Sequence, residues 1–161
     1  MIQHSRTPHL QQPSIPSNSG GKRVPNTSTF LVIGILNHLI PRFKLGRTIL
    51  RTQAEVRNYI NTHDANDTSL TVADDPYESN PYWEGCYFGV AELPYGTKLM
   101  TYGIVYNVLE GLRLWLYMDR VDKAAVFEVR HEEFGAIGIG RISPHPHPPK
   151  SVGVGDRTAS T

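Results

Sequence analysis

The sequence predicts an α+β domain: one antiparallel sheet of three or four strands packed on one main helix, at about residues 101–119, with a short N-terminal helix. Two observations predict this class. Residues 101–119 form the longest apolar-periodic segment, and two alternating segments follow it in the chain. A helix with a broad apolar stripe is typical of packing on a sheet, and a hairpin is not stable without such a partner.

The main helix is predicted from its spacing. Its central apolar residues recur at i, i+4, i+7 and i+11, which places them on one helical face. They are Val105, Leu109, Leu112 and Leu116, widened by Ile104, Val108 and Trp115. Thr101 is a suitable N-cap, because its hydroxyl can accept from a free backbone N–H one turn later. Gly111 lies within the stripe, where a small residue lets a strand approach closely.

An antiparallel hairpin is predicted after this helix. Residues 124–130 alternate, with Phe127 and Val129 on one face, and residues 134–142 return as a second strand. The glycines of that second strand indicate a bulge or a close backbone approach. They are Gly135, Gly138 and Gly140.

The segments between residues 52 and 92 are less regular. Residues 52–63 are expected to form a short helix, since Thr52 and Glu55 have capping-box spacing. Residues 64–81 are expected to form a polar loop, with a brief strand at 70–72. The aromatic and roughly alternating residues 82–92 are expected to form a strand.

Three interpretations of the apolar run at residues 29–36 stay open. It can be a buried strand, or a short buried helix that ends before Pro41. It can be the core of a displaced signal peptide, or residues 1–52 can form a transit-like presequence, because residues 1–52 contain no acid and several arginines. No signal peptide is recognisable at Met1, so secreted, mitochondrial and cytoplasmic locations all stay open. The run is too short to span a bilayer.

The 161 residues suggest one domain with two tails. Residues 1–28 are predicted to be a disordered basic and polar arm, 29–143 the α+β domain, and 144–161 a disordered Pro-rich tail. Residues 1–60 hold eight Lys or Arg against one acid, and the remainder holds eight against fourteen. This asymmetry is consistent with a basic arm for an anionic partner, with a targeting segment, or with two halves that attract each other.

The part of the chain from Tyr82 to Ile142 resembles a group of other proteins. The segment Leu99-x-Thr-Tyr-Gly-x-Val-x-x-Val-Leu-x-Gly-Leu112, with the later Gly138-x-Gly140-x-Ile142, resembles a pattern of small uncharacterised proteins of filamentous fungi. Many of those proteins look secreted. The resemblance implies a similar fold and the prospect of a secreted or effector-like protein, and it carries no activity, cofactor or catalytic residue.

No motif predicts a cofactor or a metal. The Gly138-x-Gly140 segment lies inside a predicted strand, whereas a phosphate loop precedes a helix. The single cysteine, Cys86, has no local base, although His63 or His131 could in principle supply one. The acidic residues of 64–78 lack calcium-loop spacing, and His145 with His147 are too few for a firm metal site.

A binding surface is the function that the sequence favours. Six aromatic residues cluster around residues 77–95, and on an antiparallel sheet half of them could face outward. The proposed surface consists of Tyr82, Trp83, Tyr87, Phe88 and Tyr95. The sequence therefore predicts a non-enzymatic binding module, whose partner is a protein or a small apolar ligand.

The alternative is a small enzyme with a pocket between sheet and helix. Tyrosines, with Glu84, Glu92 or His131, would act there as acid and base. A concave pocket holding a carboxylate or histidine with a perturbed pKa would favour this alternative. Nucleic acid is a weaker candidate partner, because the basic half has few aromatic residues for base stacking.

Overall fold

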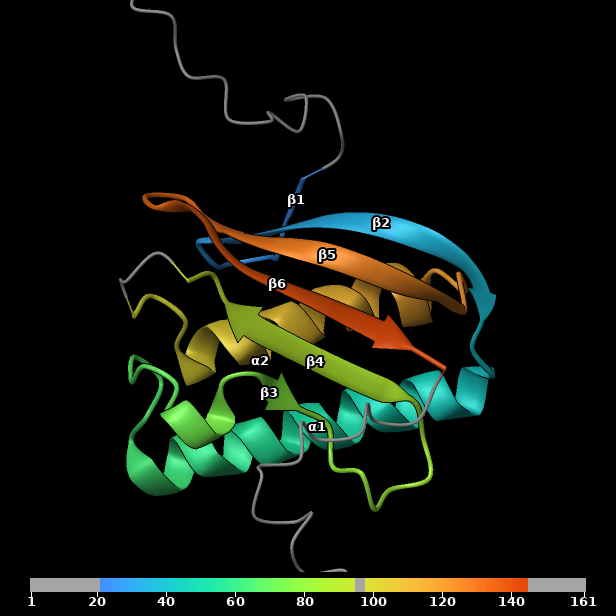
Figure 1. Cartoon of the computed structure of the whole chain (residues 1–161), viewed down its shortest axis with the longest axis horizontal. Helices are drawn as coiled ribbons and strands as arrows, with labels where there is room; N and C mark the ends of the chain where they lie inside the picture. The colour runs from blue at the N-terminus through green and yellow to red at the C-terminus, as the bar shows by residue number, and fades with distance from the viewer. Residues whose placement is uncertain (1–20, 95–97, 145–161) are drawn as a thin grey trace, which may run out of the picture.

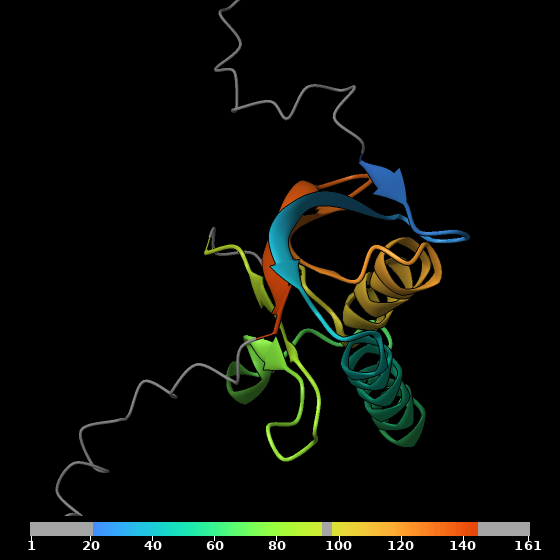
Figure 2. The same cartoon turned by 90° about the vertical axis from the view of Figure 1, so that its right-hand side faces the viewer.

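Two helices lie against one face of a six-stranded antiparallel sheet in the computed structural model, which describes residues 21–94 and 98–144 (Figures 1 and 2). The α+β class is confirmed, but the sheet has more strands than the three or four predicted. The strands are β1 (Lys22–Arg23), β2 (Thr29–Leu39), β3 (Tyr77–Glu78), β4 (Tyr87–Glu92), β5 (Lys123–His131) and β6 (Gly135–Ser143). The helices are α1 (Arg42–His63) and α2 (Tyr102–Leu112), the latter continued by a π-helical segment, Arg113–Met118.

The strand order is β1-β2-β5-β6-β4-β3, and every neighbouring pair is antiparallel. The predicted hairpin is confirmed: β5 and β6 are its two strands and form the centre of the sheet. Their register shifts between Val129 and Arg130, which is the predicted bulge. The sheet curves so that β2 arches over α2, as Figure 2 shows.

The main helix forms where predicted. Thr101 is its N-cap, and its hydroxyl accepts a hydrogen bond from the backbone N–H of Ile104 at 3.2 Å. The four central stripe residues are fully buried. Gly111 faces Leu31 of β2 and Val24, and an added Cβ would lie 2.6 Å from the Leu31 side chain. The small residue therefore permits the close approach of α2 to the strand.

The N-terminal helix is much longer than predicted. It begins after Pro41 instead of at Thr52, so the predicted capping box is wrong. Thr52 is a mid-helix residue on the buried face, beside Gln53, and the apolar residues Leu45, Ile49 and Val56 continue the same face. The two polar residues interrupt the apolar periodicity, which is why the pattern indicated a helix only from residue 52 onward.

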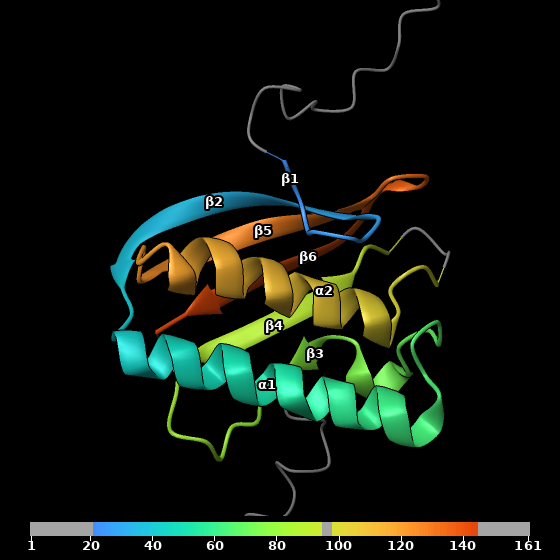
Figure 3. The ribbon, with the colours of Figure 1, turned by 180° about the vertical axis from the view of Figure 1, so that it is seen from behind.

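A polar contact joins the two helices across this interruption. Gln53 donates to Glu110 of α2 at 2.8 Å, and Arg113 donates to the same carboxylate at 2.8 and 2.7 Å. Hydrogen bonds from Arg113 and, to a smaller extent, from Gln53 lower the pKa of Glu110. The helix pair seen in Figure 3 is thus held by a charge-assisted network as well as by apolar packing.

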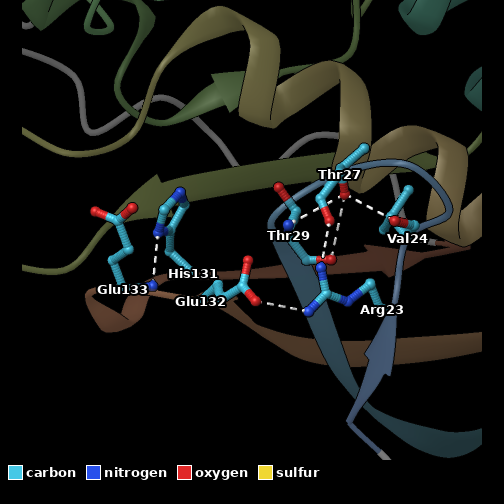
Figure 4. Close-up of polar contacts among 7 residues, drawn as sticks. All are labelled: Arg23, Val24, Thr27, Thr29, His131, Glu132 and Glu133. Atoms are coloured by element: carbon cyan, nitrogen blue, oxygen red, sulfur yellow. Dashed lines mark hydrogen bonds and ion pairs between the residues drawn. The ribbon is translucent and has the colours of Figure 1, made fainter.

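Residues 29–39 form strand β2, the first of the three alternatives. Strand β1 lies before the predicted domain boundary at Thr29: it pairs with β2, and Val24 is buried in the core. Arg23 forms an ion pair with Glu132 at 2.9 Å, and Thr27 accepts from the backbone of Thr29, as Figure 4 shows. The arm and tail predictions for residues 1–20 and 145–161 lie outside the described residues.

Two strand predictions are corrected in the middle of the chain. The brief strand predicted at 70–72 does not form: Val72–Asp74 is a 3-10 turn, and the nearby strand is β3. The aromatic strand begins at Tyr87 instead of Tyr82. Residues 81–86 instead pack beside α1, where the Thr48 hydroxyl accepts from the backbone N–H of Cys86 at 2.8 Å. The N–H of Cys86 is therefore satisfied by a side chain instead of by a neighbouring strand.

Candidate functional site

The outer face of the sheet, opposite the helices, carries a groove of about 590 Å³. Alternate residues of β2, β5, β6 and β4 form two neighbouring cross-strand rows along it, because side chains alternate between the faces of a strand. One row is Gly34, Val126, Arg141 and Gly89, and the next is Val32, Glu128, Ile139 and Ala91. We call this surface the outer groove.

The outer groove is apolar and open to solvent. Val126 is 45% exposed and Ile139 is 52% exposed, although both lie at the centre of the sheet. Gly34 carries no side chain and leaves the row of Val126 low at one end, whereas at the other end the Tyr87 side chain lies over Gly89. Exposed apolar residues that are contiguous, instead of scattered singly, mark binding surfaces.

The charges that border the outer groove are unequal. Glu128 is neutralised by an ion pair with Arg130 at 2.7 Å. Arg141 is exposed and lies 4.8 Å from the ring centroid of Tyr87, and within residues 21–94 and 98–144 no ion pair joins it to a carboxylate. Burial and a hydrogen bond to Glu78 raise the pKa of Tyr87 to about 12. At neutral pH the groove therefore offers the Arg141 cation, which has no carboxylate partner among the described residues.

A second concavity, of about 650 Å³, lies between α1 and the β3 edge of the sheet. Glu55, Asp74, Tyr77 and Glu78 line it, and we call it the acidic pocket. The hydroxyl of the buried Tyr102 donates to Asp74 at 2.6 Å, which fixes that carboxylate at the pocket wall.

Three ionisable groups in or beside the acidic pocket, Glu55, Tyr77 and Tyr102, have raised pKa values. Partial burial, and next the charge of Asp74, raise the pKa of Glu55. Burial, and next Glu55 and Asp74, raise the pKa of Tyr77. Burial and the hydrogen bond to Asp74 raise the pKa of Tyr102 to about 12. Two nearby carboxylates repel a further negative charge, and burial removes the water that would stabilise it.

The three predicted acid–base residues lie apart from this pocket. Glu84 is exposed and pairs with Arg47 at 3.4 Å. Glu92 accepts backbone hydrogen bonds from Leu99 and Met100 and so holds the loop before α2. His131 lies near the β5–β6 turn, where it accepts from the backbone of Glu133 at 3.1 Å (Figure 4). No hydrogen bond or ion pair joins any two of the three in the described parts of the chain.

The predicted aromatic surface is divided by the fold. Tyr82 is 93% exposed. Trp83 is half-buried, and the guanidinium carbon of Arg51 lies 5.7 Å from the centroid of its ring. Phe88 is fully buried against the helices and Tyr87 is 5% exposed, so these two cannot present an open aromatic face. Tyr95 lies outside the described residues.

Cys86 is buried and has neither histidine beside it. Burial raises the pKa of its thiol, which disfavours the nucleophilic thiolate. His63 instead contacts Tyr59 on α1, and His131 stacks on Phe134. No group of three or more His, Cys, Asp or Glu in residues 21–94 and 98–144 is arranged to hold a metal ion. His145 and His147 lie outside that part.

None of the helices in the described part of the chain has the length and apolarity needed to cross a membrane. No family model, no curated protein and no solved structure matches this chain. The resemblance to fungal proteins therefore stays a prediction. What the geometry of the described residues defines is a class: a small α+β protein with helices on one face of the sheet and a largely apolar groove on the other.

Sequence reasoning missed Ile139, Arg141, Glu55 and Asp74 as site residues. The hairpin alternation contains a signal for the first two, since Val126 and Ile139 are apolar on the face opposite Phe127. Glu55 was assigned to a helix cap, and Asp74 to a solvated loop. Only the packing of α1 beside β3 brings those two carboxylates together.

Proposed function

We propose that this protein is a non-enzymatic binding module whose ligand is an elongated apolar molecule that ends in an acidic group. The outer groove carries the proposal: apart from Glu128 and Arg141 its two rows are apolar, and in the described part of the chain Arg141 forms no ion pair with a carboxylate. The apolar part of the ligand lies over Val126 and Ile139. The acidic group lies at the Arg141 guanidinium, which suits a carboxylate because the two planar groups can form paired hydrogen bonds.

Decanoate and decanol test this proposal, because they share an apolar chain and differ in the acidic group. We expect decanoate to shift the amide resonances of β2, β5 and β6 in titrations followed by NMR. Arg141→Gln should raise the dissociation constant of decanoate about tenfold, which is the effect of losing one charged hydrogen bond. Decanol affinity should stay unchanged in that variant.

The apolar contribution has its own variant and control. Ile139→Asn should weaken the binding of both decanoate and decanol, because it places a polar amide in the middle of the apolar groove. Leu50→Asn is the matched control, since Leu50 is 46% exposed on α1, away from the sheet, and should bind as the wild type does. Shifts confined to other elements, or an equal loss of both ligands in Arg141→Gln, would contradict the proposal.

The enzyme alternative is favoured by one observation, the raised pKa of Glu55 in a concave pocket. A carboxyl whose pKa is raised keeps its proton to a higher pH than usual, which suits the role of a general acid. If this alternative holds, hydrolysis of chromogenic esters or glycosides should fall in Glu55→Gln and persist in Glu84→Gln. Rates equal to those of buffer for the wild type would exclude these reactions.

A further inference from the structure

Strand β2 leaves part of one edge uncovered. Its other edge pairs with β5 from Thr29 through Ile35. On the open side β1 covers only Phe30 and Leu31, and no described strand pairs with residues 33–36 (Figures 1 and 3). The backbone groups that point outward from these residues therefore have no sheet partner in the described part of the chain.

The uncovered edge is also apolar. Ile35 is 48% exposed, Leu36 is 37% exposed and Leu39, at the end of the strand, is 74% exposed. No Lys, Arg, Asp or Glu occurs in residues 29–39. Natural sheets usually protect such an edge with charge, proline or a covering segment.

The opposite edge of the same sheet has that protection. Strand β3 is only two residues long, it carries the charge of Glu78, and Pro76 directly before it has no N–H to donate. In the described residues the two edges therefore differ: the β3 edge is protected, and residues 33–36 of β2 are not.

We propose that two copies of this chain associate by pairing their β2 edges antiparallel about a twofold axis. A twofold interface places the same patch on both subunits, and an antiparallel strand edge is complementary to itself in hydrogen bonding. Because β2 carries no carboxylate or ammonium group, the pairing brings no like charges together. Since β1 occupies the edge at Phe30 and Leu31, the axis lies near Ile35 and Leu36.

Sedimentation velocity of the full chain tests the dimer. The wild type should sediment as a dimer at high micromolar concentration and dissociate on dilution. Ile35→Lys and, separately, Leu36→Lys should each raise the dimer dissociation constant at least tenfold, because they place two like charges at the axis. Val72→Lys is the control: Val72 is 89% exposed in the 3-10 turn, so the same change should leave the dimer intact.

A second measurement keeps the test independent of any loss of folding. In an equal mixture of isotope-labelled and unlabelled wild-type chains, intermolecular NOEs should connect residues 33–36 of one copy with the same residues of the other. A wild type that is monomeric at all concentrations overturns the proposal. So does a dimer that persists in both lysine variants. Amides of residues 33–36 protected in the monomer would show that another part of the chain covers this edge, and would also overturn it.

Discussion

Phe127→Ala is expected to lower the free energy of unfolding by about 3–5 kcal/mol, the typical loss for a buried phenylalanine. Phe127 is 4% exposed, at the centre of β5, and its ring stacks with that of Phe88 at a centroid distance of 6.3 Å. The ring also lies over Gly140 of the paired strand, so its removal leaves a void that no neighbouring side chain fills. Denaturation in urea, followed by circular dichroism, measures the change.

Val126→Ala is the matched control for this prediction, because Val126 precedes Phe127 on β5 but faces the outer groove. Because Val126 is 45% exposed, we expect the free energy of unfolding to fall by no more than about 1 kcal/mol. If Phe127→Ala abolishes folding, Phe127→Leu supplies a graded change that should still cost more than Val126→Ala. Similar losses at the two positions would mean that Phe127 does not belong to the core.

Gly140→Ala is expected to destabilise the sheet by about 1–3 kcal/mol or more, although alanine usually suits a regular element better than glycine. An added Cβ would lie 2.5 Å from the backbone carbonyl oxygen of Gly89, on the neighbouring strand, and would meet the Phe127 ring. A backbone oxygen held in a strand ladder cannot move away as a flexible side chain can. The midpoint of urea unfolding should therefore fall.

Gly34→Ala tests whether the loss of stability in Gly140→Ala comes from the steric clash or from any change of glycine to alanine in a strand. Gly34 is also in a strand, but an added Cβ would lie 3.4 Å from the Val126 side chain and 3.8 Å from the Val126 backbone oxygen, which are ordinary van der Waals distances. Its stability should stay the same or rise by a few tenths of a kcal/mol. The double variant Gly140→Ala with Phe127→Leu should lose less than the sum of the single changes, because the smaller side chain relieves part of the clash. Strict additivity would contradict a contact between these residues.

The local elements that the sequence predicted well are those whose apolar periodicity is uninterrupted. The stripe around Leu109 and the alternation around Phe127 each fit one period, and Thr101 adds a cap that depends only on its neighbours in the chain. Helix α1 was underestimated because Thr52 and Gln53 place polar groups on its buried face. Their partners, such as Glu110, come from a distant segment, so local spacing does not reveal them.

By itself the sequence determined that this protein has an amphipathic helix followed by a hairpin, since side-chain periodicity is a property of the backbone geometry. Only the tertiary structure decided which strands border one another, and hence that β1 and β3 join the sheet at its edges. The same long-range pairing placed Val126, Ile139 and Arg141 on one open face. It also placed Glu55 beside Asp74. The candidate sites depend on contacts between segments far apart in the chain, whereas the predicted elements depend on neighbours within it.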